Sequence, residues 1–222
     1  MINVVTVKVR PPETLPDGVR DHGYVYTSDW VNRLKNMVRR NLPLDHVFAC
    51  ITDDPEGLDP EIVPIEAPGL PGWWNKIKAF DPKSILAERI MVIDLDVLVV
   101  GDLTPMAAYH APFVTAKQWK RIGSPKTVPL YQGSVYVFNK GYHSAVWTRF
   151  TPDCIDRFRS DGDWIAHLYP GEATFPREWV VGVKDHLDGP PEGAKVMLCM
   201  EIDGGKNDVA AERLNWVKEI WK

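Results

Sequence analysis

The sequence predicts an α/β fold in one domain, residues 1–222, with a mostly parallel central sheet that helices flank. In the first half, short β-branched segments alternate with a helical one, which is typical of strand–helix–strand units and of parallel sheets. No internal repeat, low-complexity tract or linker divides the chain, and 222 residues suffice for one sizeable core. We therefore expect one layered domain whose second half is less regular than its first.

Residues 27–43 contain the clearest predicted helix. Three apolar residues repeat there at helical intervals: Val31, Leu34 and Val38. A polar N-cap, Thr27 or Ser28, precedes them, and Pro43 ends the pattern. Runs rich in apolar and β-branched residues lie on both sides of this helix, and we expect strands at 2–9, 46–52 and 61–65.

The second half has shorter patterns. A short helix is expected over residues 74–80, and after it an apolar strand that begins near Arg89 and ends in the acidic pair Asp94 and Asp96. Further strands are expected at 111–116, 134–141 and 194–200, and further helices at 143–150, 163–169 and 209–222.

Composition excludes several classes of partner. The net charge is −4, so the chain has no long-range attraction for nucleic acid or an anionic membrane. Its three widely spaced cysteines argue against a disulfide framework or a CxxC zinc site and fit a reducing compartment. The first ten residues are charged too soon for a signal peptide, and no apolar run approaches the roughly 20 residues that span a bilayer. We therefore expect a cytoplasmic protein without a membrane span.

Two acidic residues, Asp94 and Asp96, interrupt the apolar run 90–100. Because side chains alternate along a strand, both should point to the same side. At the carboxyl end of a strand, where α/β sheets bind ligands, both carboxylates can bind one Mg²⁺ or Mn²⁺ together with substrate phosphates. An isolated DxD is a weak signal, since two solvated residues at a strand end give the same pattern.

The surroundings of this pair are more specific. The apolar strand that ends in DxD, followed by "VLVVGDL", resembles the metal and nucleotide-sugar site of GT-A glycosyltransferases, above all the family 8-like group of retaining enzymes. Further segments are similar to elements of that family: "GWWNKIKAF", "YQGSVYVFNKG", "SDGDWIAHL", "VVGVKDHL" and "LNWVKEIWK". The resemblance covers nearly the whole chain. It implies a GT-A (Rossmann-like) fold, a nucleotide-sugar donor such as a UDP-sugar, and Mn²⁺ or Mg²⁺ as the metal.

The resemblance also implies roles for particular residues. Asp94 and Asp96 would bind the metal, and Lys76 would neutralise the diphosphate. Several polar residues would contact the nucleotide: Thr6, Lys8, Asn32 and Arg33, with Tyr24 or Tyr26 stacked on the base. Small or amide residues lie near the donor sugar in the family, and the matching positions here are Gln132, Gly133 and Ser134. An ordinary surface or packing role is the alternative for each residue outside the DxD pair.

The segment "SDGDWIAHL" supplies two more carboxylates, Asp161 and Asp163, at the start of a predicted helix. One of them would cap the helix and the other would bind sugar hydroxyls; we favour Asp163 as the sugar contact. Between them this chain departs from the family. The usual glutamine, which is often discussed as lying near the anomeric carbon, is replaced by Gly162.

A second departure concerns the metal. The family closes its metal site with a histidine near the C-terminus, but the corresponding region here, "KVMLCMEIDGGKND", has none. Glu201 or Asp203 would replace that ligand, with Glu201 preferred, or the third ligand is missing and metal binding is weakened. Lys206 would stand in for the family's phosphate-binding lysine.

The main hypothesis is thus a metal-dependent glycosyltransferase with retention of anomeric configuration. Its acceptor is unknown and includes protein, glycan, lipid carrier or modified nucleic acid. A phosphatase of the haloacid dehalogenase type also has DxD after an apolar strand, but its motif has Thr or Val where this chain has Leu98. A catalytically impaired nucleotide-sugar binding protein is the second alternative, which the missing histidine and glutamine favour.

Overall fold

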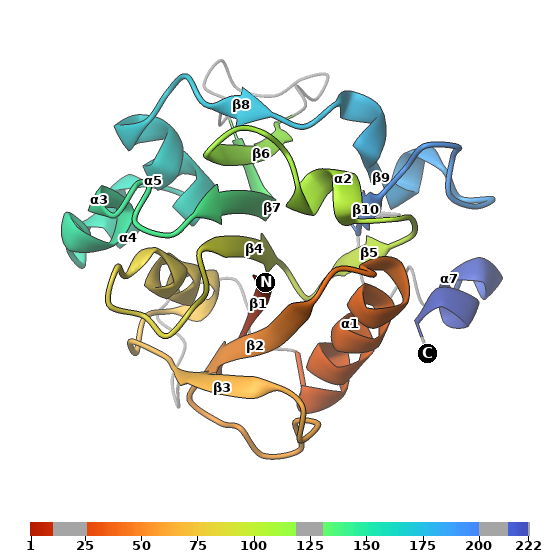
Figure 1. Ribbon diagram of the computed structural model, residues 1–222, viewed down its shortest axis with the longest axis horizontal. Coiled ribbons are helices and arrows are strands. Elements are labelled where there is room, and N and C mark those ends of the chain that lie inside the picture. The colour runs from red at the N-terminus through yellow and green to blue at the C-terminus, as the bar shows by residue number, and fades with distance from the viewer. Residues whose placement is uncertain (11–25, 119–130, 200–212, 222) are drawn as a thin grey trace.

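The computed structural model describes residues 1–10, 26–118, 131–199 and 213–221. Its centre is a seven-stranded sheet with the strand order β3-β2-β1-β4-β7-β6-β8 (Figure 1). These strands are β1 (Ile2–Lys8), β2 (His46–Thr52), β3 (Val63–Glu66), β4 (Arg89–Ile93), β6 (Phe113–Lys117), β7 (Tyr131–Asn139) and β8 (Ala173–Thr174). A three-stranded sheet with the order β5-β10-β9 contains β5 (Val97–Val99), β9 (Val180–Gly182) and β10 (Val196–Leu198).

Helices lie on both faces of the large sheet (Figure 1). The longer ones are α1 (Ser28–Asn41), the 3₁₀ helix η1 (Gly72–Phe80), α5 (Asp161–Leu168) and α7 (Asn215–Ile220). The short ones are α2 (Thr104–Ala107), α3 (Ala145–Thr148), α4 (Asp153–Arg157), η2 (Arg177–Trp179) and η3 (Val183–Asp185). The patterns at 27–43, 74–80, 143–150 and 163–169 therefore predicted helices correctly, with ends that differ by a few residues.

The first four strands of the large sheet run parallel, so their carboxyl ends meet at one edge. Ile2 of β1 pairs with His46 of β2 on one side and with Arg89 of β4 on the other. β7 is antiparallel to both β4 and β6. The mixed, mostly parallel sheet that the sequence predicted is confirmed, and its parallel half is the part that positions the candidate site.

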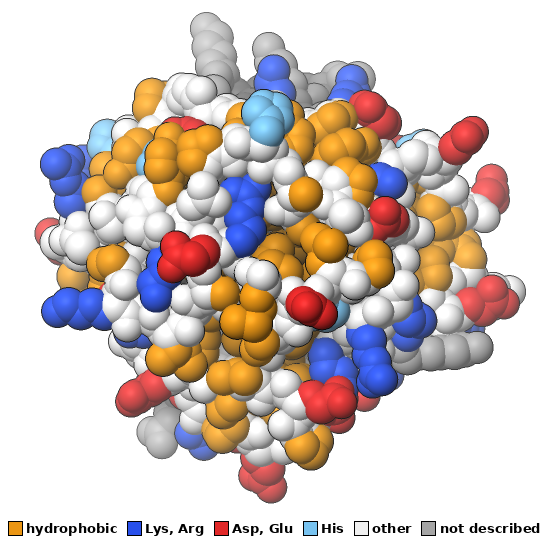
Figure 2. All heavy atoms as spheres, viewed as in Figure 1, with side chains coloured by type: hydrophobic (Ala, Val, Ile, Leu, Met, Phe, Trp, Pro, Cys, Tyr) orange, Lys and Arg blue, Asp and Glu red, His pale blue; other side chains and the backbone are white. Residues whose placement is uncertain are grey.

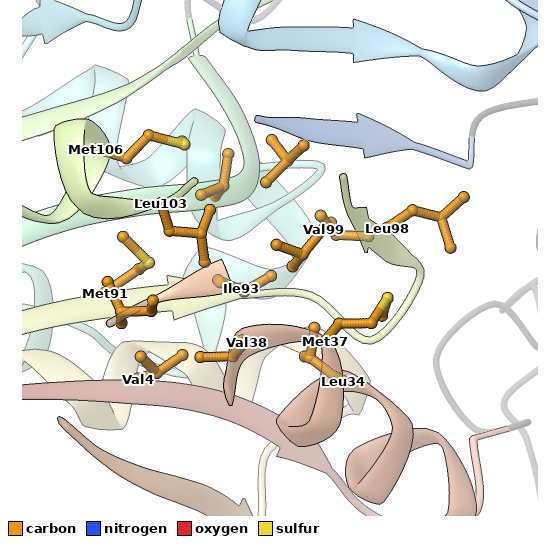
Figure 3. Packing of buried hydrophobic residues seen from close by; sticks show 14 of the residues in the cluster. Val4, Leu34, Met37, Val38, Met91, Ile93, Leu98, Val99, Leu103 and Met106 are labelled. Atoms are coloured by element: carbon orange, nitrogen blue, oxygen red, sulfur yellow. The ribbon is translucent and has the colours of Figure 1, made fainter. Parts of the chain in front are cut away.

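Alternating side chains of β1 belong to two separate cores. Val4 belongs to a core that contains residues of α1, α2 and the small sheet, among them Leu34, Met106 and Val99 (Figure 3). Val5 points to the other face and packs with residues of η1, α3 and α5. Both β1 residues are fully buried, so each face of this strand contributes to stability.

The predicted strand that ends in the DxD pair is wrong in one respect. β4 ends at Ile93, and β5 begins at Val97 in the other sheet, so Asp94 and Asp96 lie in a turn instead of on a strand. The amide of Val97 donates to the carbonyl of Asp94 at 3.2 Å, and the amide of Asp94 donates to the carbonyl of Ser134 at 2.9 Å. These bonds hold the turn, which connects β4 to β5, beside β7 at the carboxyl edge of the large sheet.

The distribution of charge on the surface agrees with the similar numbers of acidic and basic residues in the sequence. On the face shown in Figure 2, acidic and basic side chains of the described residues are interspersed. Within the described part of the chain, no helix is long and apolar enough to cross a bilayer.

Candidate active site

A pocket of about 260 Å³ lies at the carboxyl edge of the parallel strands. Its walls come from segments far apart in the sequence: β1, the residues before α1, η1, the turn after β4, β7 and the start of α5. The described lining residues are Val7, Tyr26, Gly72, Trp73, Lys76, Asp94, Leu95, Asp96, Gln132, Gly133, Ser160 and Asp161. Ligands of open α/β sheets bind at this edge, which agrees with the position predicted for the DxD pair.

Lys76 joins three of these segments. Its ammonium is 3.0 Å from Asp94 Oδ1 and 3.1 Å from Asp161 Oδ1, and it donates to the carbonyl of Gly133 at 2.9 Å. The lysine side chain is 3% exposed and that of Asp161 is 1% exposed, whereas that of Asp94 is 27% exposed. The turn after β4, the strand β7 and the start of α5 are thus held around one buried cation.

The charges of this cluster shift several pKa values. Burial opposes the charged form of Lys76, but the carboxylates of Asp161 and Asp94 outweigh it, so the pKa of Lys76 is raised. Burial raises the pKa of Asp161 to about 6, although Lys76 acts in the opposite direction. Near neutral pH this aspartate is therefore ionised and paired with a protonated lysine.

Tyr136 is a polar residue of this cluster that the sequence reasoning missed. It lies on β7 and is fully buried, and burial together with the negative charges of Asp161 and Asp94 raises the pKa of its hydroxyl. The hydroxyl therefore stays protonated. The available signal was a tyrosine in the otherwise apolar stretch "VYVF", which sequence alone does not distinguish from ordinary packing.

An irregularity in β7 exposes the backbone to the pocket. Thr115 of β6 is paired with Tyr136, but its neighbour Ala116 is paired with Gln132, so three residues of β7 have no partner on β6. The hydroxyl of Thr115 lies 3.1 Å from the carbonyl oxygens of both Gln132 and Val135. Bulges of this kind often lie next to active sites, and here one turns the Gly133 carbonyl toward Lys76.

Two glycines allow α5 to approach this strand closely. A Cβ on Gly162 would lie 3.1 Å from the carbonyl oxygen of Tyr131 and 3.2 Å from the amide nitrogen of Gly133. A Cβ on Gly133 would lie 3.2 Å from Asp161 Oδ1. The close packing of α5 against β7 therefore explains the glycine at position 162, because the Cβ of any other residue there would contact the backbone of β7.

The structure places Asp161, and not the favoured Asp163, among the described lining residues of the pocket. Asp161 lines the pocket and contacts Lys76, whereas Asp163 is outside the described lining and pairs with Arg159 at 3.0 Å. The cap of α5 is Ser160, whose hydroxyl accepts from the amide of Asp163 at 3.3 Å. We therefore assign the pocket carboxylate to Asp161.

Four residues predicted to contact the nucleotide make contacts within the protein. Thr6 is fully buried, and Lys8, which is 6% exposed, donates to Asp54 Oδ2 at 3.0 Å. Asn32 donates to the carbonyl of Gly57 at 3.0 Å and so holds the loop after β2, and Arg33 pairs with Asp29 at 2.7 Å on the same helix. None of the four is among the described lining residues of the pocket, and their contact with a nucleotide stays a prediction.

Other predicted residues are divided between the pocket and its surroundings. Gln132 and Gly133 line the pocket, as does Tyr26, whereas Ser134 is outside the described lining. Trp73, to which the sequence analysis gave no role, also lines it. The remaining predicted residues lie outside the described part of the chain: Tyr24, Glu201, Asp203 and Lys206.

The pocket suits a divalent cation in part. Asp94 and Asp96 both line it, and one or two carboxylates plus substrate phosphates are a common ligand set for Mg²⁺ or Mn²⁺. The described residues contain no group of three His, Cys, Asp or Glu side chains placed to hold a metal ion. The described carboxylates therefore account for only part of a cation's ligand shell.

Comparison of whole structures finds the same architecture in solved proteins. The galactosyltransferase LgtC in complex with donor and acceptor sugar analogs matches with a TM-score of 0.59 and 11% identity, over 99% of this chain and 96% of that one. An active-site mutant of LgtC matches with a TM-score of 0.61. This chain has the GT-A fold.

A second glycosyltransferase shares the GT-A fold with it. GlyE of Streptococcus pneumoniae TIGR4 matches with a TM-score of 0.62 and 12% identity, over 91% of this chain and 56% of that one. No family model and no curated protein sequence matches the chain. The likeness therefore defines the fold, and the activity has to be argued from the pocket.

Proposed function

We propose that this protein transfers a sugar from a nucleotide-diphosphate donor, a UDP-sugar, to an acceptor, with a divalent cation and with retention of configuration. One observation carries this proposal. In a GT-A fold, the DxD carboxylates, a buried lysine and a second buried aspartate surround one pocket at the carboxyl edge of the sheet. The structures that share the fold are glycosyltransferases, which supports sugar transfer in general.

The charge of the pocket supports the need for a cation. Among the described lining residues, Asp94, Asp96 and Asp161 contribute three carboxylates and Lys76 contributes one ammonium. A diphosphate would be repelled by this excess of negative charge unless a cation offset it. Asp94 and Asp96 would hold Mn²⁺ or Mg²⁺, which supplies Lewis-acid stabilisation of the leaving diphosphate.

The remaining side chains have roles that their positions suggest. Asp161 at the pocket floor is ionised and suits hydrogen bonds to sugar hydroxyls. Gly133 leaves room for a sugar to approach the backbone of β7, and Gln132 offers an amide next to it. The rings of Tyr26 and Trp73 give the pocket aromatic walls that suit a base or a sugar face.

The proposal is tested by incubating the protein with a panel of nucleotide sugars and Mn²⁺ and measuring the released nucleoside diphosphate. We expect slow hydrolysis of at least one UDP-sugar, lost when Mn²⁺ is chelated and lost in the Asp96→Ala variant. Binding of a UDP-sugar without any turnover, across acceptors of protein, glycan, lipid and nucleic-acid type, would instead support the binding protein. Absence of both binding and turnover would contradict the proposal.

A further inference from the structure

The three hydrogen-bond donors of Lys76 are matched by three acceptors. A protonated lysine has three N–H groups and no acceptor. Here they meet Asp94 at 3.0 Å, Asp161 at 3.1 Å and the carbonyl of Gly133 at 2.9 Å. No N–H of Lys76 is left for a phosphate oxygen while all three contacts are made.

The three contacts differ in their access to a ligand. Asp161 is 1% exposed and Gly133 O belongs to the backbone of β7, so both contacts are part of the scaffold. Asp94 is 27% exposed, lies in a turn and faces the pocket. It is also the residue that Lys76 shares with the proposed metal, so the lysine and a divalent cation compete for one carboxylate.

We propose that Lys76 is an internal counter-ion of Asp94, which a divalent cation displaces, so that the lysine sets the metal affinity of the free protein. This inference rests on the proposed function. After displacement, Lys76 keeps Asp161 and the Gly133 carbonyl and gains one free N–H, directed to the same pocket. Metal binding thus prepares a donor group for the nucleotide sugar, and in this role Lys76 is a positioning residue.

The physical basis is the cost of two cations at one carboxylate. The repulsion between the two cations weakens the binding of the second one, and this repulsion is strong because the lysine side chain is almost completely shielded from water. Removing the ammonium removes the repulsion and also frees the Asp94 oxygen that the ammonium contacts. Coupling between two ligands of one site is reciprocal. If Lys76 weakens the binding of the metal, the metal weakens the contact between Lys76 and Asp94.

The test is Mn²⁺ binding without nucleotide, by titration calorimetry or by the loss of the free Mn²⁺ signal in electron paramagnetic resonance. We expect Lys76→Met to bind Mn²⁺ more tightly than wild type by at least about fivefold, the lower end of typical coupling between sites. The matched control is Lys78→Met in the same helix. That lysine pairs with Asp81 at 2.9 Å and lies over the ring of Trp147, outside the described pocket lining, so Mn²⁺ affinity should not change.

A double variant, Lys76→Met with Asp161→Asn, separates competition from net charge and also guards against misfolding. It removes one positive and one negative charge together, so the charge of the cluster equals that of wild type, and no buried carboxylate is left unpaired. We again expect tighter Mn²⁺ binding than in wild type. Equal or weaker binding by the folded double variant, or no Mn²⁺ binding by any form, would overturn the inference. A failure of sugar transfer would not, because these titrations contain no nucleotide sugar.

Discussion

Asp96 lies in a turn, lines the pocket and is followed directly by β5. Its side chain is therefore not part of the packed core, in contrast to its neighbour Leu95, which is 2% exposed. The sequence reasoning found this pair because two carboxylates in an apolar run are rare and spaced for one cation. It favoured Asp163 over Asp161, but which of the two carboxylates lies at the pocket depends on how α5 is rotated against β7, and local patterns do not encode that rotation.

Asp96→Ala should weaken binding of a nucleotide diphosphate in the presence of Mn²⁺ by at least tenfold, or about 1.4 kcal/mol. The free energy of unfolding should change by no more than about 0.5 kcal/mol, since no core contact is lost. Calorimetric titration with UDP, with and without Mn²⁺, measures the first quantity and urea unfolding the second. Unchanged metal-dependent binding of UDP would remove Asp96 from the site.

Asp161→Asn should reduce kcat/KM for the transfer or hydrolysis reaction by about a hundredfold or more, a usual cost of losing one charged active-site contact. The amide keeps the size of the side chain but loses the charge that holds Lys76. Asp163→Asn is the matched control, because Asp163 pairs with Arg159 outside the described pocket lining. A larger loss in the Asp163 variant than in the Asp161 variant would restore the assignment that the sequence favoured.

At the scale of elements, the sequence predicted α1 and β2 well, because the helix has a clear apolar period and the strand is bounded by polar turns. It missed the division of residues 90–100 into β4 and β5. Both segments are fully buried, so no alternation of polar residues marks where one sheet ends and the other begins. The placement of the pocket depends on this division, since it turns two strand residues into a loop.

Gly162→Ala should lower the free energy of unfolding by about 1–2 kcal/mol, the cost of an added methyl group against fixed backbone atoms. Helix propensity alone predicts the opposite sign, a gain of roughly 0.5–1 kcal/mol. Gly171→Ala is the control, since a Cβ there would have no atom within 4 Å. Urea unfolding of both variants measures the sign of the change in the free energy of unfolding. A stabilised Gly162→Ala protein would show that α5 is not packed tightly against β7.

At the scale of the whole molecule, the pocket exists because the topology brings the carboxyl ends of β1 and β4 beside β7 and the start of α5. The sequence indicated the parallel half from its strand–helix–strand order. The order of β7, β6 and β8 depends on long-range pairing, which local patterns do not encode. Local patterns also did not show that Lys8 and Asn32 donate hydrogen bonds to the loop after β2.

A buried histidine should make the stability of the whole molecule depend on pH. His143 stacks on Tyr169 with ring centroids 3.6 Å apart, and burial lowers its pKa to about 4. The unfolded chain takes up this proton near pH 6.5 and the folded chain only near pH 4, so this residue reduces stability as the pH falls through that window.

His143→Asn removes the titrating ring and suits the positive φ of 64° at this position. We expect the variant to lose less stability than wild type between pH 7 and pH 5, measured by urea unfolding at both values. The comparison reports on His143 together with Glu172, whose carboxylate lies 2.8 Å from Nε2 of His143, whereas the raised pKa of Asp161, which acts with the opposite sign, is present in both proteins. Parallel losses in the two proteins would contradict this assignment.

The central claim is that the pocket at the carboxyl edge binds a nucleotide sugar through a divalent cation. Its most direct test is the thermal stability of the protein with a panel of nucleotide sugars, with Mn²⁺ and with chelator. A bound donor at 100 times its Kd should add about 2.7 kcal/mol of apparent stability, only when Mn²⁺ is present and not in the Asp96→Ala variant. Stabilisation that is equal with chelator, or absent for every nucleotide sugar in wild type, would contradict the claim.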